Sequence, residues 1–342
     1  MSPTDLTGAD YWLPLICAGI IGLAVAMYVV LDGFDLGVGI LFPYFPAEVH
    51  RDQAMNSVAP FWDGNETWLV LGGTGLLVTF PLAYAVIMSA LYVPLILMLL
   101  ALVFRGVAFE FRWVAKPNHE KWDIAFAAGS TVAAFCQGLM LGGLLSGIRV
   151  EGHQFGGGAF DWFSPFSLMC GFGLVIGYAF LGACWLIMKT AAGVEELARR
   201  LARPLCVVFL LFILLVSVWT PLEFDRIATR WFSVPNIYYL APIPILTVVL
   251  AVSCWRGIYG KHPTLAFCSA VGLFIVALVG LLVSTMPYII PPSVTLWQAA
   301  ASPASQGFIL AGMSIMVPVI LGYTVFVYHT FRGKIRPGEG YH

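Results

Sequence analysis

The stretch that decides the fold is YWLPLICAGIIGLAVAMYVVL, which occupies residues 11–31 and contains no Asp, Glu, Lys or Arg. A membrane-spanning helix needs about 20 predominantly apolar residues, so this stretch predicts one. The residues before it lack the basic segment of a secretory signal, and no small-residue cleavage site is evident. We therefore expect a retained membrane helix rather than a removed signal peptide.

The rest of the chain has the same apolar character. Of its 342 residues, 60% are hydrophobic and 10% are charged, and the mean hydropathy is +0.89. Soluble domains are about half apolar and a quarter charged, so a soluble globular domain, a disordered chain and a disulfide scaffold are excluded. The net charge of −1 provides no broad basic surface, which excludes a nucleic-acid partner. The seven cysteines lie in apolar runs without a C-x-x-C motif and predict no zinc site.

Stretches free of charged residues predict nine membrane-spanning helices in a single integral membrane domain covering residues 1–342. The stretch 67–104 is too long for one helix and breaks at Pro81, because proline removes a donor and disfavours helix at the preceding residue. The stretch 263–331 holds two helices separated by a loop rich in Pro and Ser. The expected helices cover about residues 11–31, 57–80, 82–104, 124–148, 163–188, 204–222, 237–255, 264–285 and 306–331.

The basic residues predict how the helices are oriented. Of 17 Lys and Arg residues, 14 fall in the C-terminal tail and the loops after odd-numbered spans, and 3 fall in the remaining loops. Cytoplasmic loops carry the excess of Lys and Arg. We therefore expect the N-terminus outside the cell and the C-terminus in the cytoplasm.

Two carboxyl groups interrupt the apolar sequence where the first expected helix ends. Asp32 and Asp35 lie in the stretch LDGFDLG at residues 31–37, and their spacing places them on one face if the helix continues. A carboxylate near a helix C-terminus faces the negative end of the helix dipole, and at the centre of a membrane helix it costs about 2.5–3.5 kcal/mol. Two interpretations stay open: solvated carboxylates at the membrane surface, or a site that takes up protons or cations.

A second acidic motif, PFWDGNETW at residues 60–68, opens the second expected helix on the same side. Asp63 and Glu66 are again three residues apart and fit a capping box, with Asp63 as the N-cap. Alternatively, the helix begins near residues 56–57 and Asp63 lies about two turns, roughly 10 Å, inside the membrane. Two close carboxyls in a low dielectric share a proton, so the second arrangement suits proton relay.

Two basic residues lie at the cytoplasmic ends of other expected spans. Arg105 either neutralises a carboxylate of the two acidic motifs or is an ordinary anchor on the positive side of the membrane. Lys189 follows Trp185 by four residues, and we expect its side chain to extend to the membrane surface.

The histidines fall in loops, at helix ends or in the tail, and none lies in the middle of an expected span. They are His50, His119, His153, His262, His329 and His342. A haem inside a helix bundle takes a His or Met axial ligand from a facing helix. The sequence therefore predicts that this chain does not hold a membrane-buried haem through histidine.

Several of these motifs resemble a known family. Residues 32–39 (DGFDLGVG), 56–69 (NSVAPFWDGNETWL) and 104–112 (FRGVAFEFR) are similar to subunit II of the cytochrome bd ubiquinol oxidases, in the branch often called cyanide-insensitive oxidase. Weaker matches follow at residues 181–190 and 328–334. The resemblance covers most of the chain.

The resemblance implies an all-α protein of the bacterial cytoplasmic (inner) membrane, with two four-helix bundles plus one peripheral helix. It implies a heterodimer with subunit I, which carries two b-type haems, one d-type haem and the external quinol site. The complex oxidises quinol and reduces dioxygen. This chain is then expected to be haem-free, with no catalytic residue or metal ligand of its own. Some members hold a structural quinone, and small single-helix accessory subunits are further expected partners besides lipid.

The resemblance also assigns roles to residues. It implies that Asp63 begins a proton path toward the oxygen-reducing haem, with Trp62 beside it, and that Asp32 and Asp35 are the family's paired aspartates. The residues themselves add Asn65 and Glu66 to the predicted path, although Glu66 departs from the Gln of some family members, and Arg105 is the candidate charge partner. Two alternatives stay open from the residues alone: a proton-coupled secondary transporter, and a purely structural assembly subunit.

Overall fold

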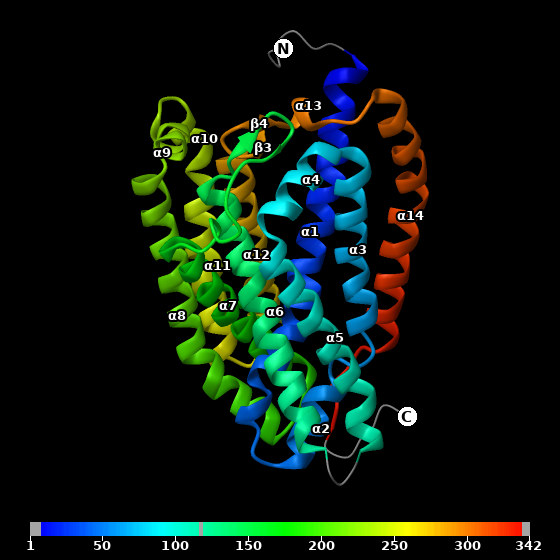
Figure 1. Ribbon diagram of the computed structural model, residues 1–342. Helices are drawn as coiled ribbons and strands as arrows, with labels where there is room; N and C mark the ends of the chain where they lie inside the picture. The colour runs from blue at the N-terminus through cyan, green and yellow to red at the C-terminus, as the bar shows by residue number, and fades with distance from the viewer. Residues whose placement is uncertain (1–7, 116–118, 337–342) are drawn as a thin grey trace.

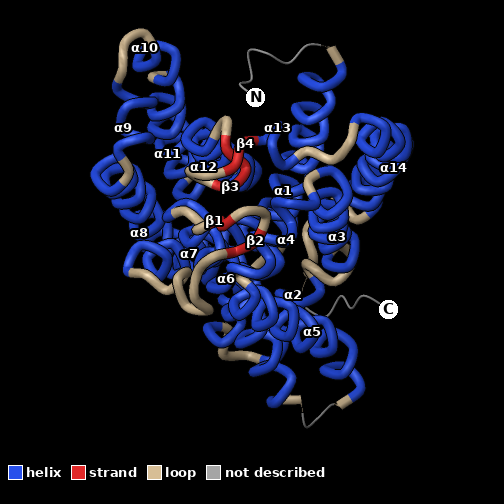
Figure 2. Tube along the Cα trace, turned by 45° about the horizontal axis from the view of Figure 1, so that its top comes forward, coloured by secondary structure: helices blue, strands red, loops and turns tan. Residues whose placement is uncertain are grey.

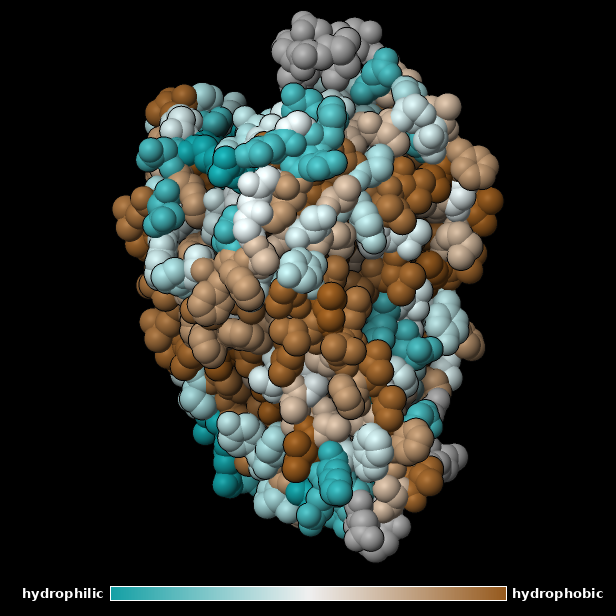
Figure 3. Space-filling view, in the orientation of Figure 1, coloured by the Kyte–Doolittle hydropathy of each residue, from teal (hydrophilic) through white to brown (hydrophobic). Residues whose placement is uncertain are grey.

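A computed structural model describes residues 8–115 and 119–336, and these form a bundle of long helices with the two termini at opposite ends (Figure 1). A broad hydrophobic band crosses the middle of the face shown in Figure 3, while hydrophilic residues gather toward its two ends. This distribution is the one expected of a protein whose middle faces lipid.

The elements follow one another in a simple order. The helices are α1 (Ala9–Leu41), η2 (Phe42–Tyr44), α2 (Glu48–Asn56), α3 (Trp62–Thr79), α4 (Pro81–Ala90), α5 (Tyr92–Val114), α6 (Glu120–Ser146), α7 (Pro165–Lys189), α8 (Gly193–Glu223), α9 (Asp225–Phe232), α10 (Asn236–Leu240), α11 (Pro242–Tyr259), α12 (Pro263–Thr285), α13 (Leu296–Ala299) and α14 (Pro303–Thr330). Two antiparallel hairpins, β1 (Val150–Glu151) with β2 (Gln154–Phe155) and β3 (Tyr288–Ile290) with β4 (Val294–Thr295), lie in the connecting loops.

Within the described residues, eight helical segments are long and apolar enough to cross a membrane. They are α1, α5, α6, α7, α8, α10 with α11, α12 and α14. The chain is therefore an all-α, multi-pass membrane protein. The remaining long helix, α3, carries Asp63, Asn65 and Glu66 in its first turns and is less apolar for that reason.

The first helix continues past its predicted end at residue 31 to Leu41, so the LDGFDLG motif lies inside it. The glycines of this motif let neighbouring backbones approach closely. A Cβ at Gly37 would lie 1.9 Å from the backbone oxygen of Tyr178 in α7, and one at Gly39 would lie 2.0 Å from Ser130 Oγ in α6. These close contacts stabilise a helix that the charge-free stretch alone does not predict.

Three other predicted boundaries are wrong. The helix expected over 57–80 begins only at Trp62, after a turn. The helix expected over 82–104 is two helices, α4 and α5, which break at Leu91 because Pro94 has no N–H to donate to the carbonyl of Ala90. The helix expected over 204–222 begins earlier, at Gly193, because its charged first turns pair with one another at i, i+4 spacing. The break at Pro81 is present as predicted.

The central helix of the bundle is α1. It packs against α3 and α14 on one side and against α6, α7 and α12 on the other, and Figure 2 shows it between α3 and α12. The main core lies along this helix, where Phe34 stacks on Trp185 of α7 with ring centroids 4.1 Å apart. Any polar group on the inner face of α1 is therefore removed from solvent.

Candidate functional site

A buried ionic cluster lies on the inner face of α1. Asp32 and Arg105, from α1 and α5, are fully buried, and Arg105 Nη1 donates to Asp32 Oδ1 at 2.6 Å. The other end of the same guanidinium, Nη2, donates to Glu66 Oε1 of α3. One arginine therefore joins both acidic motifs, and it is not a surface anchor.

The second aspartate of the first motif has an uncharged partner. Asp35 is 1% exposed, and Asn65 Nδ2 donates to its Oδ2 at 2.7 Å. The same amide lies 3.3 Å from the Leu31 carbonyl oxygen, and the Tyr328 hydroxyl of α14 donates to Asn65 Oδ1 at 3.2 Å. Asn65 thus connects α1, α3 and α14, and it fixes the orientation of the Asp35 carboxyl.

The cluster extends into α6 and α7 through neutral side chains. The Tyr178 hydroxyl donates to Gln137 Oε1 at 2.8 Å, and Gln137 Nε2 donates to the Tyr28 hydroxyl oxygen at 2.9 Å. Tyr28 lies one turn before Asp32 on α1, and its hydroxyl lies beside that carboxyl. Sequence reasoning missed these three residues. The available signal was Gln137, a polar amide inside the charge-free stretch 124–148.

The cluster contains more carboxyl groups than cations. Asp32, Asp35 and Glu66 supply three carboxyl groups, whereas Arg105 supplies one cation. A buried carboxylate needs a cation, hydrogen-bond donors or a bound proton. An arrangement of carboxyl, hydroxyl and amide groups inside a membrane protein can therefore accept and release protons.

Asp63 does not join this cluster. Its residue is exposed in the first turn of α3, where the N-cap is Phe61 and no side chain caps the helix. The capping-box interpretation is therefore wrong, as is a helix start near 56–57. Trp62 is half-buried, and its ring stacks on Phe109 of α5 with centroids 4.8 Å apart. The interpretation of Asp32 and Asp35 as solvated carboxylates is wrong too, because α1 continues past them into the core.

Comparison with known proteins shows which family this chain belongs to. The sequence model of a protein family described as cytochrome bd terminal oxidase subunit II matches residues 13–331. The chain belongs to this family.

Curated relatives of this subunit match along almost its whole length. It is 28% identical to a probable cytochrome oxidase subunit 2 of Haemophilus influenzae, with 95% of this chain and 94% of the relative covered. It is 28% identical to the cytochrome bd-I ubiquinol oxidase subunit 2 of Escherichia coli K12, covering 92% and 93%. It is 26% identical to the cytochrome bd ubiquinol oxidase subunit 2 of Bacillus subtilis, covering 96% and 97%.

A solved structure shares the fold of this subunit. The structure of bd oxidase from Geobacillus thermodenitrificans matches with a TM-score of 0.76 and 17% sequence identity. The match covers 93% of this chain and 98% of the other. At this identity the likeness concerns the fold alone.

Lys189 lies at the end of α7, but its side chain is buried and does not extend to the surface. The residue is 6% exposed, and its Nζ donates to the backbone oxygen of Phe331 and lies 3.4 Å from that of Gly333. The ammonium also lies 5.3 Å from the centre of the Phe61 ring. The C-terminal tail is thereby held against the residue that precedes α3, and the surface-anchor interpretation is wrong.

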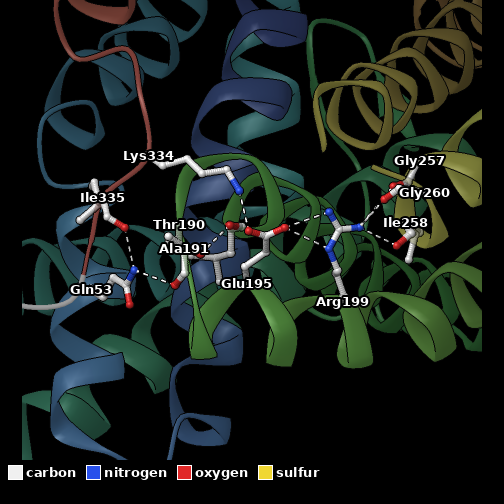
Figure 4. A network of polar contacts seen from close by, with 11 residues as sticks. Gln53, Thr190, Ala191, Glu195, Arg199, Gly257, Ile258, Gly260, Lys334 and Ile335 are labelled. Carbon is white, nitrogen blue, oxygen red and sulfur yellow. Dashed lines mark hydrogen bonds and ion pairs between the residues drawn. The ribbon is translucent and has the colours of Figure 1, made fainter. Parts of the chain in front are cut away.

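Further polar contacts hold the same tail to two other elements, α2 and α8, and α8 in turn contacts the end of α11 (Figure 4). Gln53 Nε2 of α2 donates to the backbone oxygen of Ile335 at 2.7 Å, and Lys334 Nζ lies 2.5 Å from Glu195 Oε2 of α8. Glu195 in turn accepts from Arg199, whose Nη1 donates to the Ile258 carbonyl at the end of α11. This network joins the ends of helices from both sides of the bundle at the end where the described C-terminal tail lies.

The described histidines lie away from the middle of the spans. His50 is in α2, His119 and His262 are N-cap residues, His153 is in a hairpin turn and His329 is in the last turn of α14. His342 lies outside the described residues. Across residues 8–115 and 119–336, no group of three His, Cys, Asp or Glu side chains is arranged to hold a metal ion.

Proposed function

We propose that this chain is a haem-free subunit II of a bd-type quinol:dioxygen oxidoreductase. It stabilises the haem-bearing subunit I and supplies cytoplasmic protons to the oxygen-reducing haem, without independent catalysis. The observation that carries the proposal is the buried cluster of Asp32, Asp35, Glu66 and Arg105, because lipid excludes such groups unless they have partners.

The path begins at the exposed carboxyl of Asp63 in the first turn of α3. Glu66 lies one turn further along the helix, and its side chain is 28% exposed while it also contacts Arg105. Arg105 reaches Asp32, and Asn65 reaches Asp35. The half-buried indole of Trp62 shields the start of this path on the α5 side. The carboxyl groups therefore change from exposed at Asp63, through 28% exposed at Glu66, to buried at Asp32 and Asp35 on α1.

The haems belong to the partner in this proposal. The positions of the described histidines do not fit axial ligation of a haem in the middle of this bundle. When bound in subunit I, two b-type haems and one d-type haem supply the electron transfer and oxygen chemistry. The quinol substrate, a structural quinone and single-helix accessory subunits belong to the same proposal.

The proposal includes a topology. The eight apolar spans and α3 make nine crossings, arranged as two four-helix bundles plus one peripheral helix. The proposed orientation has the C-terminus in the cytoplasm and the N-terminus outside, in a bacterial inner membrane, and the excess of Lys and Arg at the C-terminal end supports it.

Replacement of Asp63 tests the proposal. Asp63→Asn is expected to lose oxidase turnover while the haem absorption spectrum of the purified complex stays unchanged. Asp225→Asn is the matched control, because Asp225 occupies the first turn of α9, which lies at the opposite end of the bundle (Figure 1). Normal turnover in Asp63→Asn would remove this carboxyl from the mechanism.

Two rival functions give different results. A purely structural subunit keeps its turnover when Asp32, Asp35 and Asp63 are each neutralised, provided that the complex assembles. A proton-coupled transporter does not purify together with haem d. The tail network at the cytoplasmic end favours a stabilising role as part of the function, since it ties both sides of the bundle together.

A further inference from the structure

Asp35 has surroundings that set it apart from the other carboxyls of the cluster. Asp32 is paired with the guanidinium of Arg105, and Glu66 has the same cation and a 28% exposed side chain. Asp35 is buried, and its hydrogen bond within the described residues comes from the neutral amide of Asn65. Its second oxygen, Oδ1, is buried and has no hydrogen-bond partner among the described residues.

The titratable groups around Asp35 give it no cation of its own. Asp32 lies one turn earlier on α1, Glu66 approaches from α3 and the Tyr328 hydroxyl from α14. Arg105 approaches from α5, but both of its terminal nitrogens already donate to other carboxylates. An ionised Asp35 would therefore be a third carboxylate around one guanidinium, and an uncompensated buried charge is strongly unfavourable.

We infer that Asp35 carries a proton as the neutral carboxylic acid, while Asp32 stays ionised against Arg105. A proton on Oδ1 converts an unpartnered acceptor into a donor, and Asp32 Oδ2 is a second buried carboxyl oxygen without a partner among the described residues. The two carboxyls are three residues apart on one helix face. One proton thus turns Asp35 Oδ1 into a donor and reduces the excess negative charge beside Asp32.

The role of this proton rests on the proposed function, and it makes the proposed proton path more specific. Asp35 is then the internal proton store of the path: its O–H bond breaks when a proton moves onward, and a proton arriving through Glu66 restores it. The Asn65 amide orients the acid, and it is a positioning residue.

Infrared spectroscopy of the whole purified oxidase tests where the proton is held. A neutral carboxylic acid has an infrared C=O stretching band that shifts in D2O, whereas a carboxylate lacks this band. The difference spectrum between the unchanged protein and Asp35→Asn is expected to show the loss of one such acid per complex. Glu66→Gln is the matched control, because it neutralises a neighbouring carboxyl of the same cluster and is expected to keep the band.

Each other outcome overturns the inference. If the band persists in Asp35→Asn, another group holds the proton, and if it disappears in Glu66→Gln, that group is Glu66. If Asp35→Asn does not assemble, Asp35→Glu keeps the acid and must shift the band, so an unchanged band refutes the assignment. Turnover of Asp63→Asn is measured separately, so a failed proton path and a misplaced proton give different results.

Discussion

Removal of the Arg105 guanidinium is expected to be among the most destabilising single changes in this subunit. Arg105→Met keeps an unbranched apolar stem but leaves Asp32, whose side chain is fully buried, without its cation. Loss of one partner of a buried ion pair costs about 3–5 kcal/mol, mainly through the uncompensated charge. Glu66 contributes less to this cost because its side chain is 28% exposed and can be rehydrated.

The measurement is the free energy of unfolding of the subunit in mixed micelles, with the haem spectrum of the complex as an independent check on assembly. Arg149→Met is the matched control, since Arg149 pairs with Glu151 where the side chains are 72% and 60% exposed. An exposed pair of this kind contributes about 0–1 kcal/mol. The double variant Asp32→Asn/Arg105→Met removes both partners, so a coupling of about 0.5–3 kcal/mol between the two sites is expected.

Two results would refute this reasoning. One is a loss for Arg105→Met no larger than that for Arg149→Met, which would mean that the cluster is hydrated in the membrane. The other is a double variant whose loss equals the sum of the single losses, because strictly additive effects would show that the two side chains do not interact.

Two further changes test the packing around this cluster. Gly37→Ala places a Cβ 1.9 Å from a backbone oxygen of α7 and is expected to cost about 1–3 kcal/mol of stability. The control is Gly22→Ala, whose Cβ meets nothing within 4 Å, so its thermal unfolding midpoint is expected to stay nearly unchanged. Equal midpoints for the two variants would contradict the close helix contact. Lys189→Met removes the buried donor that holds the C-terminal tail, so limited proteolysis is expected to cut the tail faster than in the unchanged protein, while Lys261→Met, at an exposed loop position, is not. A tail that resists cleavage in Lys189→Met would show that its other contacts suffice.

The class of protein follows from the sequence by itself. Hydrophobicity over about 20 residues is a local property, so most of the spans, the break at Pro81 and the polar character of the two acidic motifs are all readable without a structure. The family follows as well, because its motifs are long contiguous stretches such as residues 32–39 and 56–69.

Tertiary contacts decided what those motifs do. A rule that ends a span at its first charged residue stops at Leu31, but Asp32 is tolerated inside the helix because Arg105, 73 residues later, lies against it. Lys189 likewise lies buried because carbonyl groups 142 and more residues away accept its hydrogen bonds. The local sequence determines which polar groups a membrane helix contains. Only the packing of distant segments determines which of these groups have a partner. That partner in turn determines whether a charge is buried or exposed.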